Sequence, residues 1–115
     1  MKFDTFLNTA QESLRFSIAF QEYFHEPSLT GLQRDTYETY LKSRKRSVLI
    51  QIIKDCDHQA LNRFLENGWM DTRLLSESFS LAADCSDAQL LALLFTYQQQ
   101  QGLSCKREDI YGDFD

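Results

Sequence analysis

The stretch Asp57-His58-Gln59-Ala60-Leu61-Asn62-Arg63-Phe64-Leu65 decides the fold, because a second stretch thirty residues later repeats its pattern. The second stretch reads Asp87-Ala88-Gln89-Leu90-Leu91-Ala92-Leu93-Leu94-Phe95. Asp, Gln and Leu coincide at three of the nine positions, and the other apolar positions match in kind. Self-similarity at a fixed period is typical of helical repeats, in which stacking one unit on the next completes the core.

The similarity continues upstream and outlines the repeating unit. Apolar residues at 49, 52 and 53 correspond to those at 79, 82 and 83, so each unit consists of a helix, a tight polar turn, a second helix and a link. Short links make consecutive helices antiparallel. The sequence therefore predicts an all-α fold, built as a compact stack of antiparallel helix pairs in the manner of a short α-solenoid.

The rest of the chain also favours helix. Pro27 is the one proline, glycine occurs four times, and Leu, Gln, Glu and Ala are common. We expect a helix over 3–25 that Pro27 ends. The strict alternation of apolar residues over 14–20 is typical of a strand, but a lone strand would leave its backbone polar groups unpaired, so helix is favoured.

Capping signals divide the remaining chain. They predict a capping box at Thr30–Gln33, a cap at Asp57, a left-handed stop at Gly68, a cap at Asp71 or Thr72, a second capping box over 86–89 and an end at Gly102. We expect one helical domain over 1–102, with helical units at 31–67 and 71–101, followed by a flexible acidic tail at 103–115.

Composition indicates a soluble cytoplasmic protein of one domain. The 115 residues are 43% hydrophobic and 25% charged. No apolar run approaches the roughly 18 residues that a membrane span needs, and acidic and amide residues interrupt any signal-peptide core near the N-terminus. Three widely spaced cysteines without a C-x-x-C pair predict reduced thiols.

The net charge of −5 is concentrated near the C-terminus. Residues 71–115 hold three basic and eight acidic side chains, whereas residues 1–70 hold nine of each. An acidic segment of this kind repels phosphate, so we expect no direct nucleic-acid partner. The exception is Lys42–Arg46, with four positive charges in five residues, which is either a solvated helix face or a surface for an acidic partner.

The stretch Leu81-Ala82-Ala83, a short polar turn and the Leu-rich run 89–94 resemble the helix–turn–helix part of an ankyrin repeat. The run from Asp57 to Gly68 is similar to the second helix and closing glycine of such a repeat. Residues 40–101 also resemble a divergent ankyrin-like module of bacterial proteins of unknown function. The Thr-Pro-Leu-His start of ankyrin repeats is absent, because Ser78-Phe79-Ser80-Leu81 stands there. The resemblance implies protein binding without catalysis.

Catalytic and metal-binding signals are weak. The densest cluster is His58 with Cys56, Asp55 and Asp57, but it lies in a turn where Asp57 already serves as a cap. Cys85 occupies the matching turn of the second unit, so we expect it roughly 10 Å from Cys56, one repeat spacing away and too far for a disulfide without rearrangement. No nucleotide-binding, nucleophile-elbow or zinc-protease motif occurs. We therefore predict no catalytic residue, cofactor or metal.

Binding features are better represented. Trp69 and Met70 lie in a link after Gly68, where they either anchor a protein partner or pack across the repeat interface. Other candidates for partner contact are Tyr37, Tyr40, Arg44, Lys45 and Arg46, together with Tyr111 and Phe114 of the tail, which is either a docking peptide or simply disordered.

The leading hypothesis is therefore a non-catalytic protein–protein interaction module that uses its repeat edges, Trp69 or the acidic tail. One alternative is a small acidic regulator that imitates phosphate charge and inhibits a nucleic-acid-binding protein. Another is a homo-oligomer joined through the unfinished ends of the helical stack.

Overall fold

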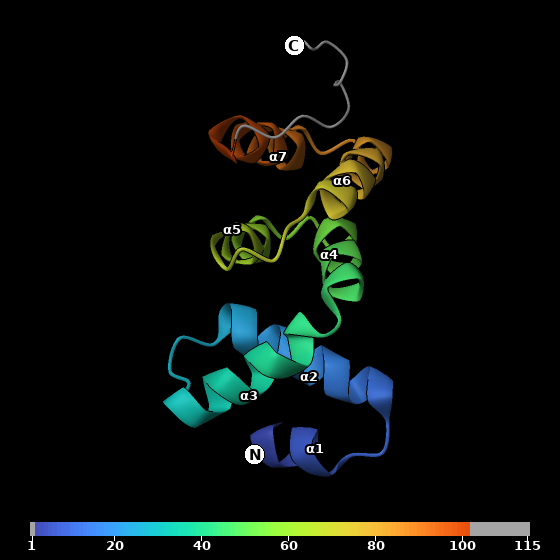
Figure 1. Cartoon of the computed structure of the whole chain (residues 1–115). Coiled ribbons are helices and arrows are strands. Elements are labelled where there is room, and N and C mark those ends of the chain that lie inside the picture. Colours follow the sequence, from blue (N-terminus) through green and yellow to red (C-terminus); the bar gives the residue numbers. More distant parts are fainter. Residues whose placement is uncertain (1, 102–115) are drawn as a thin grey trace. The chain divides into compact units, whose positions relative to one another are not determined.

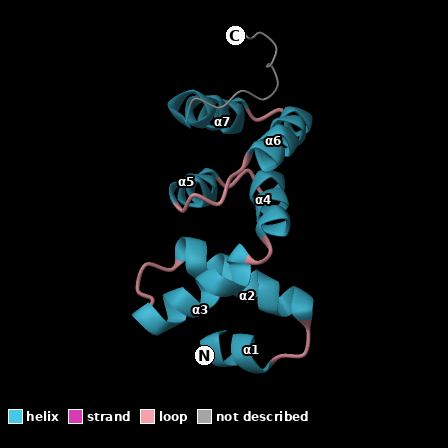
Figure 2. Cartoon of the chain, viewed as in Figure 1, coloured by secondary structure: helices cyan, strands magenta, loops and turns pink. Residues whose placement is uncertain are grey.

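The computed structural model describes residues 2–101, and every regular element in that range is an α-helix (Figures 1 and 2). The prediction of an all-α fold is confirmed. The helices are α1 (Lys2–Asn8), α2 (Glu12–His25), α3 (Gly31–Lys42), α4 (Lys45–Lys54), α5 (His58–Glu66), α6 (Thr72–Cys85) and α7 (Ala88–Gln101). Among these helices, none combines the length and the apolar character needed to cross a membrane.

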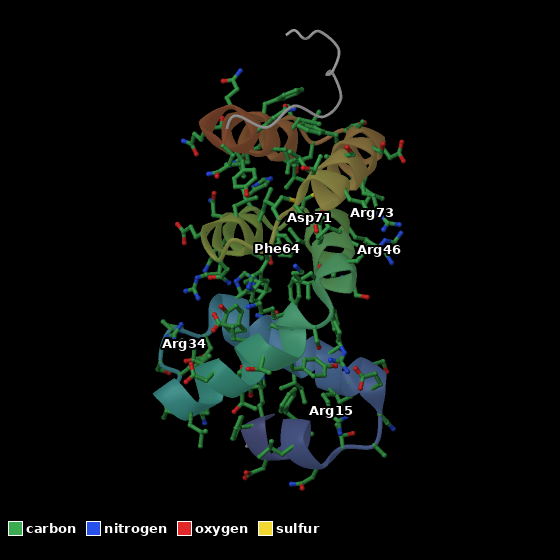
Figure 3. The ribbon with its side chains drawn as sticks, viewed as in Figure 1. Arg15, Arg34, Arg46, Phe64, Asp71 and Arg73 are labelled. Atoms are coloured by element: carbon green, nitrogen blue, oxygen red, sulfur yellow. The ribbon has the colours of Figure 1, made fainter. Side chains whose placement is uncertain are left out.

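The single N-terminal helix expected over 3–25 is wrong, because the chain breaks after Asn8 into α1 and α2. Local hydrogen bonds stabilise the break. The hydroxyl of Thr9 accepts the backbone N–H of Gln11 at 3.1 Å, and the Arg15 guanidinium donates to the carbonyls of Phe6, at 3.1 Å, and Thr9 (Figure 3). Arg15 thus satisfies carbonyl groups that the end of α1 leaves without helical partners.

Backbone contacts divide the chain into two units, with the boundary between Val48 and Leu49 inside α4. In the first unit α2 packs against both α1 and α3, whereas α3 was expected to share a unit with α4 and α5. The alternating apolar run at 14–20 lies in α2 and is helical, so the strand alternative is wrong. The buried apolar residues of this unit are Phe6, Ala19, Phe20, Tyr23, Phe24, Tyr37, Leu41 and Val48.

The second unit contains the end of α4 together with α5, α6 and α7, and in it α7 packs against both α5 and α6. Aspartate side chains begin its helices: Asp57 accepts the N–H of Ala60 at 3.1 Å, and Asp71 that of Leu74 at 2.8 Å. The apolar residues buried here are Leu49, Ile52, Ile53, Ala60, Leu61, Phe64, Trp69, Met70, Leu74, Leu75, Ala82, Leu90 and Leu94.

Besides the caps at Asp57 and Asp71, two further predicted helix boundaries are confirmed and one is corrected. Thr30 and Gln33 form the expected capping box, and Gly68 has a φ of 74°. The second capping box, expected over 86–89, is absent. Ser86 instead ends α6 in the left-handed conformation, and the carboxylate of Asp87 caps α7 by accepting the N–H groups of Gln89 at 2.9 Å and Leu90 at 3.1 Å.

The two halves of the suspected repeat have similar local geometry at their polar turns. Asp57 and Asp87 lie thirty residues apart. The carboxylate of each accepts the backbone N–H of the residue three positions later, Ala60 or Leu90, at 3.1 Å. The residues that precede them, Cys56 and Ser86, are both left-handed, with φ values of 52° and 56°. Non-glycine residues seldom adopt this conformation. These matches agree with a helix-pair duplication, which remains a proposal.

Candidate interaction surfaces

Trp69 and Met70 are packed into the second unit and are not surface anchors. Their exposed fractions are 3% and 7%. The indole ring meets the ring of Phe64 edge to face, with 5.7 Å between centroids. Of the two alternatives for these residues, the structure therefore favours packing, because a partner could reach Trp69 only by displacing it from the interior.

Tyr37 is also unavailable to a partner. Its side chain is fully buried, and the rings of Phe3 and Phe6 pack edge-on against it at centroid distances of 5.5 and 4.9 Å. Its hydroxyl oxygen has no hydrogen-bond partner among the described residues. Burial, and secondarily the charge of Glu22, raises the pKa of Tyr37 to about 12. Its role is in the packing of the first unit.

Tyr40 and Arg44 are held by contacts within the first unit. The Arg44 guanidinium lies 3.9 Å from the Tyr40 ring centroid, a cation–π arrangement. Glu12 accepts a hydrogen bond from the Tyr40 hydroxyl and another from Arg44 Nε at 3.1 Å. Burial first, then the bond to Glu12, raises the pKa of Tyr40 to about 12, and the same bond is the largest cause of the lowered pKa of Glu12.

The residues of the basic stretch Lys42–Arg46 differ in their exposure and in their contacts within the chain. The charge of Arg44 is paired within the first unit, Lys45 is half-buried, and Arg46 is exposed and also has an intramolecular interaction. An acidic partner would have to compete with these contacts. The remaining predicted residues, Tyr111 and Phe114, lie outside the described residues.

His58 and Cys56 meet at the carboxylate of Asp87, which the sequence reasoning treated as a helix cap alone. His58 Nε2 lies 3.0 Å from Asp87 Oδ2, and the Cys56 thiol donates a hydrogen bond to the same carboxylate. The bond to Asp87 is the largest cause of a raised pKa at Cys56. Bonds from the Leu90 N–H and then from His58 lower the pKa of Asp87. Asp87 corresponds to Asp57 in the thirty-residue repeat, so stacking of the two repeats would bring their polar turns together. The repeat was therefore the sequence signal for this contact.

The arrangement does not activate the thiol. A nucleophilic cysteine needs a lowered pKa, and the carboxylate does the opposite to Cys56. The neighbouring acids are engaged too, since Asp57 caps α5 and Asp55 accepts from the Gln51 amide at 3.0 Å. Within residues 2–101, no cluster of three or more His, Cys, Asp or Glu side chains is arranged to hold a metal ion. The contacts of His58 and Cys56 with Asp87 link two turns of the second unit.

Among the described residues of the second unit, the large hydrophobic side chain that is exposed is that of Phe95, and the sequence reasoning did not single it out. Phe95 of α7 is 53% exposed, and its ring packs on that of half-buried Phe79 of α6 at a centroid distance of 4.8 Å. Residues three and four positions apart share one side of a helix. This places small or apolar side chains beside the two rings. We call the set the outer face: Phe79, Ala83, Ala88, Leu91, Ala92 and Phe95.

The outer face exists because α7 carries apolar residues around most of its circumference. Leu90 and Leu94 are fully buried on the sides that meet α5 and α6. Another side of α7 carries Phe95 and the exposed alanines Ala88 and Ala92. The described helices leave this side more exposed than the side that carries Leu90 and Leu94. A helix with this distribution is normally buried on all sides.

Comparison with protein-family models, with curated proteins and with solved structures gave no match.

Proposed function

We propose that the chain is a non-catalytic protein-binding module and that its partner docks an apolar helix on the outer face. The observation that carries the proposal is the exposed ring of Phe95, paired with Phe79 at the edge of a helix pair. Aromatic residues that offer large, rigid contact area are the usual energetic anchors of protein interfaces.

The shape of the outer face favours a helix as the docking element. Ala88 and Ala92 lie one turn apart on α7 and are both exposed, so a partner backbone can approach closely between them and the Phe95 ring. In a helical stack the next helix of the array would take this place. A partner helix with Leu, Met or aromatic residues at three- and four-residue spacing would bury the same surface.

Inhibition by charge mimicry has less support. Residues 49–101 contain seven acidic side chains against three basic ones. Three of the seven, Asp57, Asp71 and Asp87, cap helices with their carboxylates, so these charges face backbone N–H groups as well as solvent. Salt separates the two functions, because a complex that depends on charge weakens steeply as ionic strength rises, whereas an apolar interface does not.

Site-specific photo-crosslinking tests the proposal. A photoreactive phenylalanine analogue is placed at position 95 and, in separate proteins, at 92 and at 32, and each is expressed in the native host. Leu32 is a matched control, since it is 72% exposed but belongs to the first unit. We expect the same protein to be crosslinked from 95 and 92 and not from 32.

The crosslinked peptides identify the partner segment by mass spectrometry. An amphipathic helix of that partner, recovered from both positions of the outer face, supports the proposal. Recovery of the same products from 32 as from 95, or of no protein from 95, contradicts it. If position 95 instead crosslinks two copies of the chain, the partner is a second copy of this chain and not another protein, which contradicts the proposal.

A further inference from the structure

We propose that Cys56 and Cys85 form a dithiol site that small-molecule disulfides oxidise to an intramolecular disulfide. The site is independent of the outer face and of any partner. It lies in the second unit, where the turn between α4 and α5 meets the end of α6. Its substrate class is a low-molecular-weight disulfide such as oxidised glutathione.

One backbone oxygen brings the two cysteines together. The carbonyl oxygen of Ile53 accepts the N–H of Cys56 at 3.0 Å and the thiol of Cys85 at a sulfur–oxygen distance of 3.7 Å. The Cys85 sulfur is therefore nearer to the backbone of Cys56 than the expected repeat spacing of roughly 10 Å. A disulfide requires Cα atoms about 4.4–6.8 Å apart, so closure requires the turn between α4 and α5 and the end of α6 to hold the two Cα atoms within that range.

The two turns are also held together beside the thiols. Asp87, two residues after Cys85, lies 3.0 Å from His58 Nε2 and accepts the thiol of Cys56. These contacts limit how far the cysteines can separate while the second unit stays folded. Both cysteines are exposed, so a small disulfide can reach them, and neither has to leave a packed core to meet the other.

Closure proceeds by two exchange steps. The deprotonated thiol of Cys85 attacks one sulfur of the small disulfide, forms a mixed disulfide and releases one small thiolate, which takes up a proton. The Cys56 thiol then loses its proton and attacks the Cys85 sulfur, which releases the second small thiol. Two protein thiols are oxidised while one small disulfide is reduced to two thiols. Asp87 raises the pKa of Cys56, which disfavours the Cys56 thiolate and therefore disfavours attack by Cys56 in the first step.

The test uses oxidised glutathione, the full chain and peptide mapping. Trypsin leaves Cys85 and Cys105 in one peptide, residues 74–106, and Cys56 in another, residues 55–63. The chain is therefore oxidised as the Cys105→Ser variant, or as Cys105→Ala if circular dichroism shows that the serine variant is unfolded. We expect loss of two hydrogen atoms from the intact mass, no retained glutathione, and a crosslink between the two peptides.

A second measurement asks whether the fold, and not chance collision, joins the thiols. The equilibrium constant for closure in a glutathione buffer is compared between the folded chain and the chain in urea. We expect it to be at least about tenfold higher in the folded chain, and we expect the reduced Cys56→Ser, Cys105→Ser double variant to stop at a glutathione adduct on Cys85. Persistent adducts on the chain with both cysteines, disulfide-linked dimers, or equal constants in urea and buffer would overturn the proposal.

Discussion

Replacing Trp69 with alanine should lower the free energy of unfolding of the second unit by much more than a substitution in an exposed link between helices would. The side chain is 3% exposed, so its truncation forfeits nearly the full transfer free energy of the indole and leaves a cavity against Phe64. Truncations of buried Trp or Phe to Ala cost about 3–5 kcal/mol, of which an edge-to-face ring contact contributes roughly 0.5–1.5 kcal/mol. Domains of this size have about 5–15 kcal/mol in total.

Urea unfolding followed by circular dichroism measures the change in the free energy of unfolding, with Leu32→Ala as the control. Leu32 is 72% exposed, so its variant should stay within about 0.5 kcal/mol of the parent. The Trp69 variant should lose at least about 3 kcal/mol, with a Tm lower by roughly 12 °C or more. A loss below about 1 kcal/mol for Trp69→Ala would refute the burial argument and restore the residue as a surface anchor.

Three further predictions concern polar and ionisable groups. Tyr37→Phe removes a buried hydroxyl that has no hydrogen-bond partner in the described part of the chain, so the free energy of unfolding should stay equal or rise by up to about 1–3 kcal/mol; a clear loss in urea unfolding would show a missed partner. The pKa of Tyr40 is raised from 10.0 to about 12, so the stability that this group contributes is complete below pH 10 and is lost as the pH rises through about 12. Ultraviolet titration should show fewer late-titrating tyrosines in Tyr40→Phe, and an unchanged curve contradicts this. The pKa of Asp87 is lowered by its bonds to Leu90 and His58, so its contribution is present above the ordinary value of 3.8 and is lost as the pH falls below it. Asp87→Asn should flatten the acid limb of a stability–pH profile relative to the parent, and an equally steep acid limb in the variant would contradict this.

Helix boundaries that depend on neighbouring residues could be predicted from the sequence. Thr30 with Gln33, Asp57 and Gly68 each act within a few residues of their own position, and the structure has all three as expected. The break between α1 and α2 could not be predicted this way. It depends on Arg15, which reaches back to the carbonyls of Phe6 and Thr9, and a pattern of apolar spacing contains no sign of that contact.

The candidate site was harder to predict because the exposure of a side chain depends on which residues from other parts of the chain pack against it. Trp69 and Phe95 are both aromatic residues among apolar neighbours, and spacing alone does not tell which one faces solvent. Trp69 packs on the ring of Phe64 and is 3% exposed, whereas Phe95 packs on the ring of Phe79 and is still 53% exposed, so an aromatic neighbour alone does not decide burial. The contact between His58 and Asp87 likewise joins turns twenty-nine residues apart.

The affinity of the crosslinked partner, purified and titrated against Phe95→Asp and Leu32→Asp, tests the binding role of the outer face most directly. Circular dichroism first confirms that both variants are folded. We predict that Phe95→Asp raises the Kd at least about thirtyfold, the effect of losing an interface anchor of about 2 kcal/mol, while Leu32→Asp leaves it within about threefold of the parent. Equal Kd values for the parent and Phe95→Asp, or equal losses for the two variants, would contradict the account.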